Sequence, residues 1–272
     1  MKRPARRFGK TQCQAAALAL IALVACTGAT GPDRATGEAV KRDVAASAMA
    51  EPDQQEWQRL LGPGWIIIGS SHGSIRGSEL PVSAVLAEGT DLTFIKKNDG
   101  LGISELDLNP RRLVMVEQAP SGWKIWVDFQ GWLPRAGSED TPCLLDPFAE
   151  GGVSVVDGSL QIATQHFYGC GSWYISNQTF KFHRDGNRLR LIGKESYSLH
   201  RASHEVTAIS TNFLSHRQEV TFEPGPDGEE GTVENAPKKT IRRIARKVWY
   251  IEDMDPEVCW DGGESLPAWC DQ

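Results

Sequence analysis

Four histidines are the first residues in this chain whose types and spacing could do chemistry. His200 and His204 stand four residues apart in SLHRASHEV, with Glu205 beside the second. On a helix that spacing would put both imidazoles on one face, where they could hold zinc. The segment instead lies between two strand-like runs and lacks the order His-Glu-x-x-His, so we expect surface-loop histidines. His166 and His183 lie near the ends of neighbouring predicted strands, and packing explains them as well as a shared site does.

Serine and paired carboxylates suggest two other kinds of chemistry. Ser70, Ser71 and His72 are consecutive, but no G-x-S-x-G turn surrounds the serines and no orienting acid can be assigned. Glu139 and Asp140 are adjacent in RAGSEDTP, a stretch typical of a solvated turn. Paired carboxylates for glycoside hydrolysis are recognised only by their separation in space. The sequence therefore assigns no catalytic, metal-binding or cofactor-binding residue.

Tryptophans suggest a binding role rather than a catalytic one. The chain has nine tryptophans, and exposed indoles would suit a platform for sugar or peptidoglycan. Trp123 falls at a predicted inward position, where filling the core is the default. Trp126 and Trp132 are the expected exposed tryptophans, because Trp126 lies on the polar face of its strand.

Four cysteines remain after the first two, and an even number in an exported chain favours two disulfides. Three pairings are open, and we favour Cys143 with Cys170 and Cys259 with Cys270. The second pair would close a C-terminal tail over residues 253–272. A zinc site is the alternative, but the chain has no Cys-x-x-Cys.

The elements that must position these residues are strands. In GWKIWVDFQ, residues 122–130, apolar side chains alternate with polar ones, which is typical of a half-buried strand. Asp157-Gly158 and Asp185-Gly186 each separate two strand-like runs and indicate tight hairpins. Strands are expected at 65–69, 82–88, 92–96, 112–118, 122–129, 153–156, 159–166, 172–183, 188–196, 206–213 and 217–223.

The predicted fold is mainly β, an antiparallel meander of about ten strands, sandwich-like or like propeller blades, with little helix. A short helix is expected at Gln54–Leu61. The run Thr240–Ile251 suits both a helix and a strand, and we favour a strand. Residues 56–252 would form one β-rich globular domain.

The N-terminus indicates export. Residues 1–25 begin with five basic residues and no acidic one, and then carry an apolar run too short to span a bilayer. Leu23-Val24-Ala25-Cys26 resembles the bacterial lipobox, which implies cleavage before Cys26, acylation of its sulfur and a bacterial lipoprotein facing the periplasm. Thr27 in place of an aspartate resembles the outer-membrane sorting state. The alternative is cleavage near Ala29, which would leave a secreted protein.

The charge of the chain excludes one class of partner. Residues 26–55 are rich in small and polar residues and are expected to form a flexible tether. The whole chain carries a formal charge of −6, so removal of the five basic residues of the signal leaves about −11 and argues against nucleic-acid binding. The basic residues between 238 and 247 are expected to form a solvated face opposite the acidic loop 223–230, with contact to anionic lipid as the alternative.

Two stretches resemble known bacterial β-proteins. GSIRGSELPVSAVL, residues 73–86, resembles the loop and strand of FG-GAP and VCBS-like proteins, usually written D-x-N-x-D-G-x-x-D before an apolar strand. GGVSVVDGSLQIATQHFYGCGSW, TFKFHRDGNRLRLIG and STNFL resemble a family of uncharacterised exported β-proteins. This second resemblance covers about 65–250 and implies no known reaction.

The departure from the first motif is informative. In the parent loop, acidic residues would hold Ca²⁺, which requires about six to eight oxygen ligands. Here Ser74, Arg76, Ser78 and Val82 stand at those positions. We therefore expect a degenerate loop that binds no calcium, in which the Arg76 guanidinium takes the vacated place and bonds nearby carbonyls.

The leading hypothesis is a membrane-anchored binding or structural lipoprotein of the cell envelope, with no cofactor and with an envelope protein or glycan as partner. The alternative is an envelope hydrolase, and a third hypothesis is a calcium-dependent module that kept only its scaffold. A cleft with converging histidine and carboxylate side chains would favour the enzyme. An exposed apolar patch around Trp126 or a bare sheet edge would favour the binding module.

Overall fold

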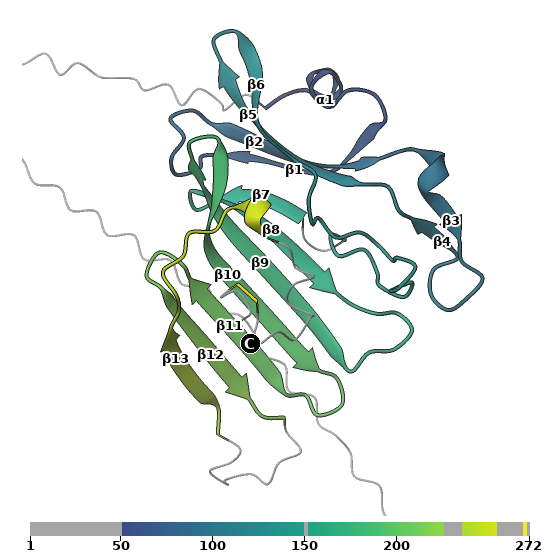
Figure 1. Cartoon of the computed structure of the whole chain (residues 1–272), viewed down its shortest axis with the longest axis vertical. Helices are drawn as coiled ribbons and strands as arrows, with labels where there is room; N and C mark the ends of the chain where they lie inside the picture. The colour runs from purple at the N-terminus through teal and green to yellow at the C-terminus, as the bar shows by residue number, and fades with distance from the viewer. Residues whose placement is uncertain (1–50, 150–151, 226–235, 255–268, 271–272) are drawn as a thin grey trace, which may run out of the picture. The chain divides into compact units, whose positions relative to one another are not determined.

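Antiparallel strands make up most of the structure (Figure 1). A computed structural model describes residues 51–149, 152–225, 236–254 and 269–270, which all belong to the unit Ala46–Gln272. The expected signal peptide, Cys26 and most of the tether lie outside the described residues, as does Cys259. Within the described part of the chain, no helix is long and apolar enough to cross a bilayer.

The strands form three antiparallel sheets, which confirms the predicted fold class. The first has the order β1-β2-β5-β6, from β1 (Trp65–Gly73), β2 (Val82–Gly89), β5 (Arg111–Ala119) and β6 (Gly122–Phe129). The second has the order β13-β12-β11-β10-β9-β8-β7, from β7 (Gly152–Val156), β8 (Ser159–His166), β9 (Tyr174–Asp185), β10 (Arg188–His200), β11 (Val206–Asn212), β12 (Arg217–Glu223) and β13 (Lys238–Arg243). The third is the small pair β3 (Ile95–Lys97) and β4 (Glu105–Asp107).

Most expected elements are present, with three differences at short segments. The strand expected at 92–96 is a 3-10 turn, η1 (Leu92–Phe94), followed by β3, and β4 was not expected. The last predicted strand ends at Arg243, and a second 3-10 turn, η3 (Ile251–Asp253), lies further on. Both expected hairpins are confirmed, and Asp157 and Gly158 adopt the positive φ values of 50° and 71° that the first one requires.

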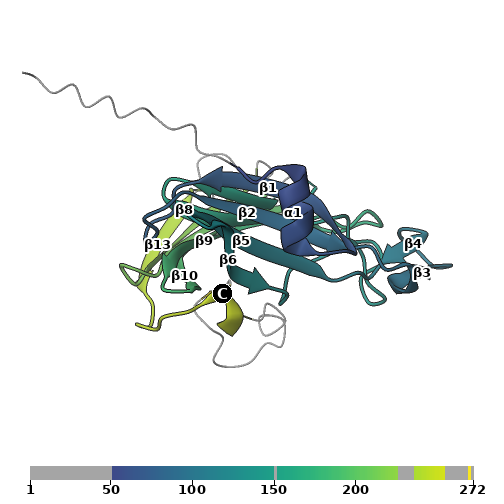
Figure 2. The same ribbon diagram turned by 90° about the horizontal axis from the view of Figure 1, so that it is seen from above.

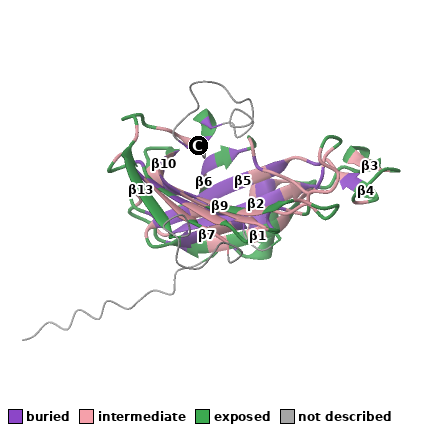
Figure 3. Ribbon diagram, turned by 90° about the horizontal axis from the view of Figure 1, so that it is seen from below, coloured by how far each residue is buried: buried purple, intermediate pink, exposed green. Residues whose placement is uncertain are grey.

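The four-stranded sheet is covered on both faces. One face packs against β8, β9 and β10 of the seven-stranded sheet, and the two sheets share the larger apolar core (Figure 3). The other face packs against α1 (Gln54–Leu61), the helix predicted there, through Trp57 and Leu61 (Figure 2). Asp53 begins this helix by accepting a hydrogen bond of 2.8 Å from the Glu56 N–H. This layering explains why β2 is buried along almost its whole length.

A bulge between β5 and β6 overturns the expectation for Trp126. Met115 pairs with Val127 and Val116 with Ile125, so Trp126 is the extra residue between two pairs. The alternation therefore changes face at this point. Ile125 packs toward α1, whereas Trp126 and Val127 both enter the core between the sheets, where Trp126 is 8% exposed.

Candidate ligand-binding cleft

A cleft of about 730 Å³ opens where the loop after β6 meets the end of β8. Its volume is in the range usual for small-molecule sites. Three segments supply its walls: the start of β5, the loop from Gln130 to Leu144, and the residues that end and follow β8. The described lining residues are Pro110, Arg111, Gln130, Gly131, Trp132, Leu133, Pro134, Arg135, Gly137, Ser138, Thr141, Leu144, His166 and Tyr168.

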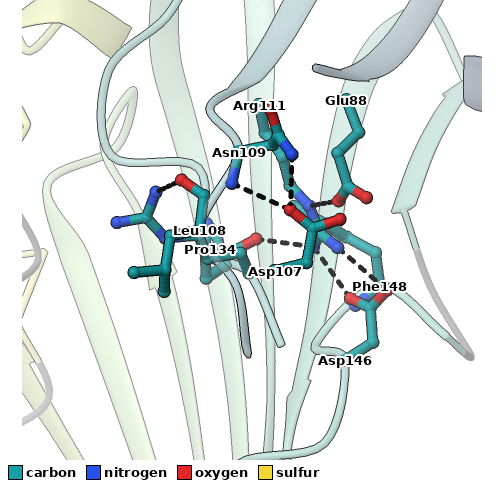
Figure 4. A network of polar contacts seen from close by, with 9 residues as sticks. Glu88, Asp107, Leu108, Asn109, Arg111, Pro134, Asp146 and Phe148 are labelled. Atoms are coloured by element: carbon teal, nitrogen blue, oxygen red, sulfur yellow. Dashed lines mark hydrogen bonds and ion pairs between the residues drawn. The ribbon is translucent and has the colours of Figure 1, made fainter. Parts of the chain in front are cut away.

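Arg111 holds the first wall together (Figure 4). Its side chain is 3% exposed. The Nε donates to Glu88 at 2.6 Å, and the two terminal nitrogens donate to both oxygens of Asp146 at 2.8 and 2.9 Å. A fourth bond of 2.7 Å reaches the carbonyl of Pro134 in the loop after β6. One guanidinium therefore joins β2, β5, the cleft loop and the segment that precedes β7.

The charges of this network stabilise each other. Burial by itself lowers the pKa of Arg111, but its hydrogen bonds with Asp146 and Glu88 outweigh burial and raise the pKa. Burial alone would raise the pKa of Asp146, yet the bonds from Arg111 and from the Phe148 N–H lower it. Arg111 and Asp146 are therefore both charged at neutral pH, and the one guanidinium faces the carboxyl groups of Asp146 and Glu88.

Arg135 lies on the rim of the same cleft and is placed by the turn before β5. Asn109 orders that turn, because its side chain bonds Asp107 at 2.8 Å and the carbonyl of Asp91 at 3.1 Å. The adjacent Leu108 carbonyl accepts a bond of 2.5 Å from Arg135. Arg135 is half-buried, and in the described part of the chain it forms no ion pair.

The second wall is tied to the first by a disulfide. Cys143 and Cys170 are bonded, as the sequence predicts, with their Cα atoms 5.5 Å apart. The same two segments also pair through the backbone, since Gly169 N–H donates to the Cys143 carbonyl at 2.8 Å and Leu145 N–H to Phe167 at 3.0 Å. Cys270 is buried, and its predicted partner Cys259 lies outside the described residues, so that pairing stays a prediction.

His166 and Tyr168 extend from this second wall into the lining of the cleft. Burial and the positive charge of Lys194 lower the pKa of His166, so the imidazole is neutral at neutral pH. A neutral imidazole offers one donor and one acceptor. The cleft thus combines a neutral histidine, a phenol and two arginines, of which Arg111 is ion-paired, and none of its described lining residues is Asp or Glu.

The other residues singled out in the sequence do not form a joint site. His166 ends β8 and pairs with Ser176 near the start of β9, whereas His183 lies near the end of β9 and pairs with Arg190. Ser176 and His183 are seven residues apart, so the two histidines lie at opposite ends of β9 and on opposite faces of the sheet. His200 ends β10, and His204 lies in the following loop. No group of three or more His, Cys, Asp or Glu among the described residues is placed to hold a metal ion.

The serine and carboxylate candidates have structural partners. Ser71 Oγ accepts a bond of 2.9 Å from Val155 N–H and so links β1 to β7. His72 Nδ1 lies 3.1 Å from Glu51 at the surface. Glu139 is exposed and pairs with Lys96 at 2.8 Å, as expected for a solvated turn.

The degenerate cation loop contributes to packing. Val82 is 1% exposed and belongs to the core between the sheets, and Ser78 Oγ bonds the carbonyl of Leu80 at 2.8 Å. Ser74 and Arg76 are exposed, and the backbone of Arg76 bonds Gly158 and Arg184. The Arg76 guanidinium was expected to bond this loop. Among the described residues, the guanidinium that bonds Ser78 is instead that of Arg184, which also donates to Glu117.

Sequence reasoning identified His166 but not the arginines beside it. Arg111 and Arg135 carry no motif, because their partners are 23 to 35 residues away or are backbone carbonyls. Arg111 lies one residue before the strand expected at 112–118, and only its burial in the structure distinguishes it. No protein-family model, curated protein or solved structure matches this chain.

The fold and the cleft together describe an antiparallel β-protein in which two larger sheets share a core, with a partly cationic cleft where the loop after β6 meets the end of β8.

Proposed function

We propose that this protein is a binding module of the bacterial cell envelope, anchored through acyl chains on Cys26. The observation that carries the binding role is the cleft of about 730 Å³, whose walls are held by the Arg111 network and the Cys143–Cys170 disulfide. A cleft fixed in this way loses little conformational entropy when a ligand enters. The anchor is supported by the lipobox-like residues Leu23–Cys26 and by the basic start of the chain.

The chemistry of the lining suggests an anionic ligand with hydroxyl groups. Arg135 is a cation without an ion-pair partner among the described residues, so a carboxylate or phosphate would complete it. His166 and Tyr168 would exchange hydrogen bonds with hydroxyl groups of the ligand. The histidine of the cleft has no carboxylate beside it in the described lining, so the cleft favours binding over the hydrolase alternative.

Ligand titration tests the cleft. The full-length protein in detergent is heated with sn-glycerol 3-phosphate and, separately, with glycerol. We expect the anionic probe to raise the melting temperature, Arg135→Ala to abolish the increase, and Arg201→Ala, outside the cleft, to preserve it. Equal effects of the two probes, or an unchanged response in Arg135→Ala, would contradict the proposed ligand chemistry.

Metabolic labelling tests the anchor. Radiolabelled palmitate should enter the wild-type protein and fail to enter Cys26→Ser, and the protein should fractionate with outer membranes. Cys13→Ser is the matched control and should be labelled normally. Label in Cys26→Ser, or a protein free in the periplasm, would contradict the anchored model.

A further inference from the structure

We propose a second binding site, for an acidic amino-sugar glycan of the peptidoglycan type, on an aromatic platform formed by Trp173, Tyr174, His200 and Arg201. Trp173 and Tyr174 are 67% and 56% exposed. Single exposed apolar side chains are common, but adjacent exposed aromatic rings beside a hollow indicate a binding surface. Among the described residues, this site shares no lining residue with the cleft.

The platform is rigid before any ligand arrives. The ring of His200 stacks on one face of Trp173, with centroids 5.8 Å apart and planes inclined by 10°. Tyr174 meets the same imidazole edge-on at 4.8 Å. His200 is itself held by Ser203, whose Oγ lies 2.7 Å from its Nδ1. One face of the indole is thus covered by His200, and the rest of the Trp173 ring remains exposed to solvent, where a ligand could stack.

The backbone beneath the platform is fixed as well. Arg201 N–H donates to the Trp173 carbonyl at 2.7 Å, which joins the loop after β10 to the start of β9. Ser172 Oγ bonds both the N–H and the carbonyl of Tyr174. Cys170, three residues before Trp173, is held by the disulfide. Such pre-organisation reduces the entropy that a ligand must lose on binding.

The hollow beside Trp173 has the chemistry of a sugar site. It measures about 510 Å³ and is lined by Gly171, Ser172, Trp173, Arg201 and Ala202. An indole face accepts the apolar C–H face of a pyranose ring, because the π-system is negative there. Arg201 donates one hydrogen bond to the Ser172 carbonyl at 3.2 Å. A guanidinium has five N–H donors, so others can bond a ligand.

Charge complementarity favours an acidic sugar. In the described part of the chain the Arg201 guanidinium lies over the Phe167 ring, 5.7 Å from its centroid, and forms no ion pair, so a carboxylate on the glycan would supply the missing counter-charge. The lactyl group of N-acetylmuramic acid supplies such a carboxylate where no stem peptide is attached to it, and the stem peptides carry carboxylates elsewhere in peptidoglycan. Bases of a nucleic acid could also stack on these aromatic rings, but the net charge of −6 on the protein disfavours nucleic-acid binding.

Co-sedimentation with purified, protease-treated peptidoglycan sacculi tests the platform. We expect the full-length protein in detergent to sediment with sacculi, Trp173→Ala to bind at least about tenfold more weakly, and Trp173→Tyr to retain most of the binding. Phe94→Ala removes another exposed aromatic ring and should bind normally.

Soluble disaccharides test the role of Arg201. Tryptophan fluorescence should respond to N-acetylglucosaminyl-N-acetylmuramic acid, and Arg201→Ala should weaken that response about tenfold while affecting neutral chitobiose little. Absence of sedimentation, equal sedimentation of Trp173→Ala, or equal loss for both disaccharides in Arg201→Ala would overturn the proposal. Binding that requires protein still attached to the sacculi would also overturn it, in favour of a protein partner.

Discussion

Two arginines border the same cleft and have opposite surroundings. Arg111 is 3% exposed and gives its hydrogen bonds to Glu88, Asp146 and the carbonyl of Pro134. Arg135 is half-buried and is held by one carbonyl. A buried cation needs a counter-charge from the protein, because removing it from water costs several kcal/mol. A cation at a solvated rim keeps its hydration and is free to pair with a ligand. The comparison separates residues that build the cleft from residues that can bind in it.

Removal of the buried arginine should have the largest effect. Arg111→Ala leaves Glu88 and Asp146 without their counter-charge, and we expect a loss of about 3–5 kcal/mol in the free energy of unfolding. Urea denaturation of the full-length protein measures it.

The neighbouring residue is the matched control for that experiment. Arg112 is 11% exposed and bonds the Leu61 carbonyl, but its carboxylate partner Asp128 is 40% exposed and stays solvated without it, so Arg112→Ala should cost less, about 1–2 kcal/mol. Equal losses in the two variants would show that the Arg111 network does not carry special weight.

The second wall depends on a covalent bond. Cys143→Ser opens a disulfide that spans 27 residues, and the loss of this cross-link should cost about 3–4 kcal/mol. Thermal unfolding of the variant, compared with wild type under reducing conditions, measures it. If the reduced wild type is as stable as the oxidised protein, the backbone pairing of this wall suffices by itself.

Acid should weaken both walls, in two stages. The pKa of His166 is lowered from 6.5, so the unfolded chain takes up the proton first, and stability should fall as the pH drops below 6.5 toward the folded pKa. The pKa of Asp146 is also lowered, from 3.8, so its contribution persists above that value and is lost as the pH falls through the folded pKa.

Urea denaturation between pH 8 and pH 3 follows these stages. His166→Gln should reduce the first stage and leave the second, because burial also lowers the pKa of His183 from 6.5 and that residue supplies the remainder; Asp146→Asn should remove the second stage from a lower starting stability. A first stage that is unchanged in His166→Gln would assign it to His183 or another group.

Removal of the rim arginine should have the smallest effect on stability. Arg135→Ala loses one bond to the Leu108 carbonyl, and we expect a change of about 0.5–1 kcal/mol. Urea denaturation beside Arg111→Ala gives the contrast directly. A loss as large as that of Arg111→Ala would make Arg135 part of the frame and remove the basis for a ligand cation.

Local patterns predicted much of the fold because strands and hairpins depend on neighbouring residues. Alternation and Asp-Gly turns are readable over a few residues, so most strands were expected within a few positions of their bounds. The Cys143–Cys170 pair was favoured because it would tie a long loop to the hairpin that begins near Gly169, and the structure contains it. The bulge at Trp126 is not readable in this way, because it depends on the register against β5.

The candidate site was predicted least. Exposure of Trp126 was expected, whereas the strongly exposed indole among the described residues is Trp173, which lies in the strand expected at 172–183 and directly before β9. Its ring stacks on His200, which is 27 residues further along the chain.

The amino-acid sequence by itself determined that this chain forms antiparallel strands, where its tight hairpins turn, and which cysteines could meet, because these depend on short-range periodicity and composition. Only the tertiary structure decided that Arg111 is neutralised while Arg135 is not, and that one tryptophan is buried while another is displayed. Those outcomes depend on which distant segments share a surface, and burial and charge compensation follow from that contact.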